Sequence, residues 1–322
     1  MLILLGALIV AGCAPTDQPA ATIAEHQRPQ PAPFQPAPSQ PVEALPAPEV
    51  PANPGVVVTS TGVVVPVVSG DTDHLRVRTP CGATTSVSGG TRVRQATIVL
   101  DAGHGGSETG AISPGGITEK SVNLGVVEKT KDALETAGVS VVLTRTDDYD
   151  LELGPRAEIV KSLSPRAFVS IHHNAEPDGP SPKPGTETYY QIGSSDSKRL
   201  SGLIYEEVVQ ALSAYHDVAW VADTDAGAKY RAGQHGDYYA VLRMPAPVRS
   251  VLAELAFVTN PDEAQLIARA DVQSVEGQAV ARGILRYLTT SDPGSGYTTP
   301  YPREEPPPPP GPPPPPCQDP PL

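Results

Sequence analysis

The uneven distribution of proline is the feature that most constrains how this chain can fold. Of its 39 prolines, 12 lie in residues 14–55 and 15 lie in residues 292–322. Proline removes backbone hydrogen-bond donors, and these two segments bury too little apolar surface to offset the entropy lost on ordering. The sequence therefore predicts an extended linker over residues 14–55, a disordered tail over residues 292–322 and folded structure confined to residues 56–291.

Charge and hydropathy exclude two broad classes of protein. The chain has 23 Lys and Arg against 36 Asp and Glu, which gives a formal net charge of −13. Such a surface does not gather phosphate backbones, so nucleic acid is excluded as a partner. After the first dozen residues no apolar run approaches the roughly 18 residues of a membrane-spanning helix, which excludes a polytopic membrane protein.

The N-terminus has the pattern of an export signal. Residues 1–12 read MLILLGALIVAG and lead directly to Cys13. Residues 10–13 resemble the lipobox of bacterial lipoproteins, in which the cysteine is lipidated, so we expect residues 1–13 to be a signal peptide and Cys13 to be a lipid anchor at the membrane facing the cell wall. No Lys or Arg precedes Cys13, which departs from a basic signal-peptide start, and ordinary secretion with cleavage near Ala14 is the alternative.

Besides Cys13, the sequence contains two further cysteines. In an oxidising compartment Cys81 and Cys317 are able to join the tail to the domain by a disulfide, and two free thiols are the alternative.

Residues 56–95 are rich in valine and threonine and contain Gly-rich turns. This composition predicts short β-strands, but about 40 residues are few for a separate core. A wall-binding module, an extension of the main fold and a partner site are all open for this segment.

From residue 96 onward, short apolar runs alternate with helical patterns. Strands are predicted near residues 97–101, 139–144, 167–172, 186–191, 239–243 and 250–256, and helices near residues 119–137, 155–163, 196–213, 261–269 and 271–288. Alternation of this kind indicates a largely parallel sheet covered by helices. In such folds the functional site lies beyond the carboxyl ends of the strands.

Three histidines and two glutamates lie where strands end or helices begin, or within an apolar strand. His104 follows the first strand in a Gly-rich loop, His172 and His173 end the third, Glu119 begins the first helix, and Glu254 lies in an apolar strand. Two imidazoles and one carboxylate form the open three-ligand set of catalytic zinc sites, and a free carboxylate beside them supplies a base. Because successive strand residues point to opposite faces, only one of the paired histidines faces the site.

Each of these residues also has a purely structural explanation. Glu119 is a favourable carboxylate at a helix N-terminus, and Glu254 is able to pair with Arg156 or Arg249. A single histidine after a strand is often structural. His235, in a Gly-rich stretch, is expected at the surface or at the rim of the cleft.

Five segments resemble, in order and spacing, the zinc-dependent N-acetylmuramoyl-L-alanine amidases of the amidase-3 type. They read IVLDAGHGGSETGA, GGITEKSVNL, VVLTRTDDYDLELGPRAEI, FVSIHHNA and YYAVLRMPAPVRSVLAELAFVTNPDEA, within residues 96–290. The resemblance implies that His104, Glu119 and His172 hold Zn2+ and that Glu254 is catalytic, with His173 beside the site. It also implies a single α/β catalytic domain over residues 96–291, with a central, mostly parallel sheet of about six strands flanked by helices.

The implied activity is hydrolysis of the peptidoglycan amide between N-acetylmuramic acid and L-alanine, in the intact wall or in muropeptide fragments. A catalytically silent wall-binding protein and a zinc peptidase acting within the stem peptide are the competing classes. Some members of the family carry an inserted helix that plugs the site, and residues 175–249 leave little room for one, so an open site is expected. The tail is expected to be a spacer whose removal leaves hydrolysis intact, although its proline runs also suit a proline-recognising partner.

Overall fold

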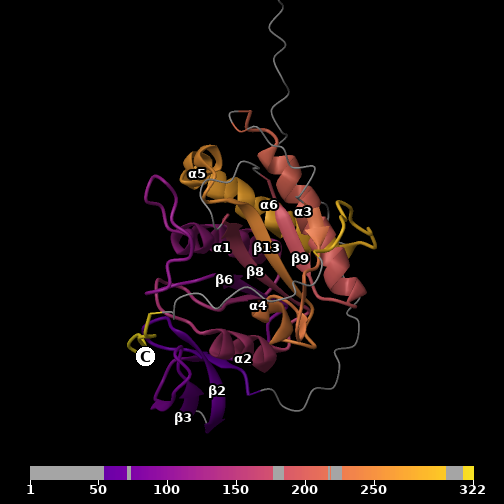
Figure 1. Cartoon of the computed structure of the whole chain (residues 1–322). Coiled ribbons are helices and arrows are strands. Elements are labelled where there is room, and N and C mark those ends of the chain that lie inside the picture. Colours follow the sequence, from indigo (N-terminus) through magenta and orange to yellow (C-terminus); the bar gives the residue numbers. More distant parts are fainter. Residues whose placement is uncertain (1–53, 71–73, 177–184, 217, 219–226, 302–314) are drawn as a thin grey trace, which may run out of the picture. The chain divides into compact units, whose positions relative to one another are not determined.

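The computed structural model describes residues 54–70, 74–176, 185–216, 218, 227–301 and 315–322 (Figure 1). Cys13, the predicted signal peptide, nearly all of the predicted linker, the proline run at 306–310 and residues 312–314 of the second proline run lie outside the described residues. Within the described residues no helix combines the length and the apolar character needed to cross a membrane.

The centre of the molecule is a six-stranded sheet with the order β10-β9-β13-β8-β6-β7. Its strands are β6 (Ile98–Ala102), β7 (Val141–Leu143), β8 (Ala167–Asn174), β9 (Glu187–Tyr190), β10 (Gly227–Lys229) and β13 (Ser250–Phe257). The sheet is mixed, because β9 runs antiparallel to β13 whereas the other neighbouring strands run parallel. The expectation of a helix-flanked α/β domain is confirmed, with this qualification on strand direction.

One predicted strand was wrong. Residues 240–243 form the short helix α4 (Ala240–Arg243), and the sixth strand is β10, which the sequence did not indicate. A short apolar run does not distinguish a strand from a helical turn, and the Gly-Ala-Lys sequence of β10 lacks the branched residues that mark strands.

Helices cover both faces of the sheet (Figure 1). Ile98 and Leu100 of β6 pack in a core with α1 (Glu119–Thr136), α3 (Ser195–Leu212) and α6 (Ala270–Thr289). Val99 points the other way, into a second core with α2 (Leu153–Leu163). This alternation along a fully buried strand is what a sheet between two helical layers requires. Helix α5 (Pro261–Ile267) begins at the predicted cap, where Asn260 accepts hydrogen bonds from the backbone of Asp262 and Glu263.

The Val/Thr-rich segment forms a five-stranded antiparallel sheet with the order β4-β3-β2-β1-β5. Its strands are β1 (Val56–Val58), β2 (Val64–Gly70), β3 (Leu75–Arg78), β4 (Thr84–Val87) and β5 (Thr91–Val93). Val56 and Val65 share the second core with Val99 and with Ile159 of α2. Because it shares this core, the segment is an extension of the main fold. A small hairpin, β11 (Ala232–Gly233) with β12 (Gly236–Asp237), lies apart from both sheets.

The structure differs from the expectation of a disordered tail for residues 292–301 and 315–322. Tyr297 and Tyr301 form bridges beside β10, and Cys317 is joined to Cys81 by a disulfide across a sequence separation of 236 residues. Of the two alternatives for these cysteines, the disulfide is the one observed. A cross-link and specific hydrogen bonds thus order residues whose composition alone would not.

Candidate metal centre and active-site cleft

Three predicted ligands converge at the carboxyl edge of the central sheet. His104 follows β6, His172 lies near the end of the adjacent strand β8, and Glu119 is the first residue of α1. One ligand atom from each lies within 4.8 Å of the others. The parallel pairing of β6 with β8, which sets Ala102 beside Ile171, brings the two histidines to the same edge.

Glu119 contacts both histidines directly. Its Oε2 lies 3.1 Å from His104 Nε2, and its Oε1 lies 2.9 Å from His172 Nδ1. Burial opposes ionisation of Glu119, but the two imidazoles outweigh burial and hold the pKa of this carboxyl well below its usual range. A carboxylate that is ionised while buried is a strong ligand for a cation.

The two imidazoles have opposite pKa shifts. Burial lowers the pKa of His104, but Glu108 and Glu119 outweigh it and raise that pKa to about 10. Burial lowers the pKa of His172, and Glu119 compensates only in part. Since a metal binds neutral imidazole, metal binding would release a proton from His104.

A second layer of hydrogen bonds orients Glu119. The Ala111 backbone N–H donates to its Oε2 at 3.0 Å, and Asn123 Nδ2 donates to its Oε1 at 3.3 Å. Asn123 also donates to the Gly103 carbonyl at 3.2 Å, so one amide spans α1 and the loop that carries His104. Sequence reasoning missed Asn123, although its position one helical turn after Glu119 places both on the same face of α1.

The loop around His104 is held by buried charges that sequence reasoning also missed. Asp101 accepts hydrogen bonds from Arg156, Thr144 and Ser170. Arg156 also donates to the Ala102 carbonyl at 3.0 Å, and Arg145 donates to the carbonyls of Ala102 and Gly103 at 2.9 and 3.0 Å. The signal that was available is an aspartate inside an otherwise apolar strand, because a buried carboxylate requires a partner.

Glycine is required where this loop meets the ligands. A Cβ on Gly103 would lie 2.1 Å from His172 Nε2, and a Cβ on Gly110 would lie 2.5 Å from Glu119 Oε2. His104 itself has φ of 62°, a left-handed conformation that is costly for a side-chain-bearing residue. Backbone strain of this kind is concentrated at functional sites.

Glu254 lies on β13, in register with His172 of β8. It is buried, and its Oε2 has no hydrogen-bond partner among the described residues. Burial raises the pKa of Glu254 well above its usual value, and the negative charges of Glu119 and Glu187 raise it further.

The alternative that Glu254 pairs with Arg156 or Arg249 was wrong. Arg156 pairs with Asp101, and Arg249 Nε lies 2.6 Å from Asp196 Oδ2. Glu254 is therefore a carboxylate beside the three converging ligands, with neither of these cations as its partner.

The ring of His173 contacts other partners than the three converging residues, as strand alternation predicted, and its backbone N–H donates to Glu119 Oε1 at 3.3 Å. Its Nδ1 lies 2.8 Å from Asn123 Oδ1, and its Nε2 lies 3.5 Å from Glu276 of α6. His235 is exposed in the turn between β11 and β12 and is absent from the lining of the cleft formed by the described residues.

A cavity of about 750 Å3 opens at the converging residues. Its lining includes the three ligands and Glu254, together with Leu151–Gly154 at the start of α2, Tyr239–Val241 at α4, and Pro315 and Cys317 of the tail. The site can therefore hold a substrate of considerable size beside a metal ion and a base.

The donor set fits a divalent metal. Two imidazoles and one carboxylate from three elements leave an open coordination position, as in catalytic sites with three protein ligands. The unpartnered Oε2 of Glu254 lies in the same cavity, where an open position would be used. Fold and site together define an α/β protein with a cleft at the carboxyl edge of its sheet, lined by residues that fit a metal ion.

A family model described as N-acetylmuramoyl-L-alanine amidase matches residues 98–286, which is more than half of the chain. The chain belongs to this family, as the resemblance predicted. The match covers the α/β domain from β6 to α6 and excludes the five-stranded sheet and the tail.

Individual relatives agree with this assignment. The chain is 34% identical over 193 residues to the YqiI protein of Bacillus subtilis (strain 168), covering 59% of this chain and 84% of YqiI. It is 30% identical over 228 residues to the N-acetylmuramoyl-L-alanine amidase AmiC of Neisseria meningitidis serogroup B, covering 62% of this chain and 54% of AmiC. It is also similar to the solved structure of N-acetylmuramoyl-L-alanine amidase AmiC2 of Nostoc punctiforme, with a TM-score of 0.51, 31% identity, and coverage of 59% of this chain and 96% of that one.

Proposed function

We propose that this protein is a zinc-dependent amidase that hydrolyses the bond between N-acetylmuramic acid and the L-alanine of the peptidoglycan stem peptide. One observation carries the proposal: His104, Glu119 and His172 converge in the same cavity as the unpartnered carboxylate of Glu254. Membership of the amidase family supplies the substrate class.

The roles proposed for the four residues are those that the family resemblance implies, and their positions in the cavity support them. His104, Glu119 and His172 hold Zn2+, which when bound polarises the amide carbonyl and lowers the pKa of water. Glu254 accepts a proton from the attacking water and delivers it to the amino group of L-alanine as the C–N bond breaks. The products are the lactyl carboxylate of the muramic acid and a free stem peptide.

The decisive experiment is mass spectrometry of the products released by the full mature chain from purified peptidoglycan and from soluble muropeptides. We expect free stem peptides that begin with L-alanine, lost on chelation and restored by Zn2+. Cuts inside the stem peptide would reassign the protein to the peptidases. Absence of products in the presence of bound zinc would favour a wall-binding role.

We further propose that the protein works outside the cytoplasmic membrane, anchored there by lipid on Cys13. The Cys81–Cys317 disulfide supports an oxidising compartment. Mass spectrometry of the membrane-extracted N-terminal peptide tests the anchor, with Cys13→Ser as the control. An unmodified protein in the culture medium would indicate ordinary secretion instead.

A further inference from the structure

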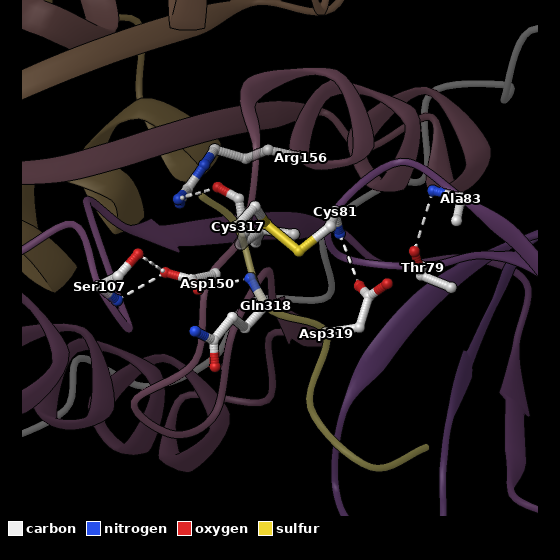
Figure 2. The surroundings of a disulfide bond; sticks show 10 residues. Thr79, Cys81, Ala83, Ser107, Asp150, Arg156, Cys317, Gln318 and Asp319 are labelled. Carbon is white, nitrogen blue, oxygen red and sulfur yellow. Dashed lines mark hydrogen bonds between the residues drawn. A yellow bond between two sulfur atoms is a disulfide. The ribbon is translucent and has the colours of Figure 1, made fainter. Parts of the chain in front are cut away.

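The last eight residues of the chain form a segment that neither the family match nor the proposed catalytic residues include. We call residues 315–322 the C-terminal strap. They have no regular secondary structure, yet they lie against both the five-stranded sheet and the loops of the α/β domain. Figure 2 shows the strap passing the Cys81–Cys317 disulfide.

The strap has four anchors along its length. The disulfide fixes Cys317, and the Cys81 backbone N–H donates to Asp319 Oδ1 at 2.8 Å (Figure 2). Further on, Thr61 Oγ1 donates to the Pro321 carbonyl at 2.7 Å, and Leu322 packs on the second core.

A further contact joins the strap to the metal-binding side of the cleft. The Gln318 backbone N–H donates to Asp150 Oδ2 at 2.8 Å, and Asp150 Oδ1 accepts from the backbone N–H and the Oγ of Ser107 at 2.6 and 2.8 Å (Figure 2). Ser107 belongs to the Gly-rich loop that begins at His104. Asp150 therefore joins the strap to this loop.

The start of the strap borders the cavity that contains the proposed metal ligands. Pro315 and Cys317 line it, together with Leu151–Gly154 at the start of α2. Pro315 is exposed, so it is free to contact a bound molecule. Cys81, the other half of the disulfide, is absent from this lining.

We propose that the strap is a substrate-contacting wall of the catalytic cleft, held in place by the Cys81–Cys317 disulfide, and that it determines how tightly muropeptides bind. This inference rests on the proposed amidase function. The strap contributes to binding of the substrate and takes no part in bond cleavage.

The position of the two cysteines allows a clean test. Cys81→Ser breaks the tether and leaves Cys317, which lines the cleft, as a free thiol, whereas Pro315→Gly changes the wall and keeps the disulfide. Thr61→Val is the matched control, because it removes a strap hydrogen bond outside the cleft while the disulfide remains. The double variant Cys81→Ser/Cys317→Ser, which leaves no free thiol at this site, is measured beside it because thiolates bind zinc.

Steady-state kinetics on a soluble muropeptide, below the melting temperature of every variant, gives the first measurement. We expect Cys81→Ser to raise KM about fivefold with kcat nearly unchanged, as expected for loss of binding made equally in ground and transition states. Pro315→Gly should raise KM by a smaller factor, and Thr61→Val should leave it unchanged. An unchanged KM in both Cys81→Ser and Pro315→Gly would overturn the proposal.

Two further measurements distinguish an effect of the strap on substrate binding from an effect on the metal site or on turnover. Zinc content should be the same in Cys81→Ser and the parent, since loss of zinc would mean that the strap acts through Asp150 and the His104 loop. Calorimetric binding of the muropeptide to Glu254→Gln, with and without Cys81→Ser, needs no turnover. If the parent cleaves no amide, the proposed function fails. The proposal for the strap is overturned separately if Glu254→Gln binds the muropeptide equally well with and without Cys81→Ser, or if neither variant binds it.

Discussion

The carboxyl edge of the central sheet, which carries His104, His172 and Glu254, and the C-terminal strap line the same cavity but are built in opposite ways. The edge is buried and is held by backbone pairing of β6, β8 and β13 and by the Asp101 ion pair with Arg156. The strap is largely exposed, has no regular structure and is held by one covalent link and a few hydrogen bonds. The chemistry of a cleft and its shape can thus be fixed by independent means. Each substitution below weakens either the edge or the strap and leaves the other intact.

Removing the proposed base has the largest expected effect. Glu254→Gln should lower kcat about 10³-fold, within the range for loss of general acid–base catalysis. Zinc content and the Cys81–Cys317 disulfide should be unchanged, because neither depends on this side chain. Glu152→Gln is the control, since Glu152 is an exposed carboxylate lining the same cavity and should retain turnover. Comparable turnover in Glu254→Gln would remove Glu254 from the mechanism.

Breaking the buried support of the edge should mainly affect stability. Asp101→Asn leaves Arg156 charged and buried without its carboxylate, which should cost about 3 kcal/mol in the free energy of unfolding. Denaturant titration measures this change, and Asp132→Asn on the exposed face of α1 should shift it by less than about 0.5 kcal/mol. Equal effects of the two substitutions would contradict the role assigned to the ion pair.

The Asp101 carboxylate also determines how the free energy of unfolding should depend on pH. Burial raises the pKa of Asp101, but Arg156, Ser170 and Thr144 outweigh it, so the pKa in the folded protein lies below the model-compound value of 3.8. The stabilisation is therefore fully present above about pH 3.8 and is lost as the pH falls through the folded-state pKa. Unfolding measured at descending pH should show a shallower acid limb in Asp101→Asn than in the parent.

Releasing the strap should have a moderate effect on stability. Cys81→Ser should lower the free energy of unfolding by about 2–4 kcal/mol, since the cross-link joins residues with a sequence separation of 236 and restricts the unfolded chain. Cys13→Ser, which keeps this disulfide, is the control. If Cys81→Ser also lowered hydrogen-exchange protection in β6, β8 and β13, the strap would be as deeply integrated as these strands, and the contrast between the two regions would be removed.

The smallest effect is expected for Asn123, whose side chain orients the proposed metal ligand Glu119. Asn123→Ala removes the amide that positions Glu119 and should weaken zinc affinity about tenfold, as for other outer-sphere partners. Competition with a chromogenic chelator measures the affinity, and Ser121→Ala on the same helix is the control. Unchanged affinity would leave the Ala111 N–H as a sufficient support for Glu119.

The sequence by itself determined the α/β class, most of the elements and the convergence of His104, Glu119 and His172. These follow from local signals, because hydrophobic periodicity sets the elements and neighbouring parallel strands bring their carboxyl ends to one edge. The roles of those residues and of Glu254 stay predictions that rest on the family resemblance.

Only the tertiary structure decided the antiparallel direction of β9, the helical state of residues 240–243 and the partner of Asp101. It also decided that the end of a proline-rich tail borders the cleft. Strand direction, burial and cross-links depend on contacts between residues far apart in the chain, and Cys81 and Cys317, at a sequence separation of 236, carry no local signal of their pairing. Composition predicted disorder for this tail because composition reflects what a segment can bury by itself, whereas a covalent link and a neighbouring surface order it from outside.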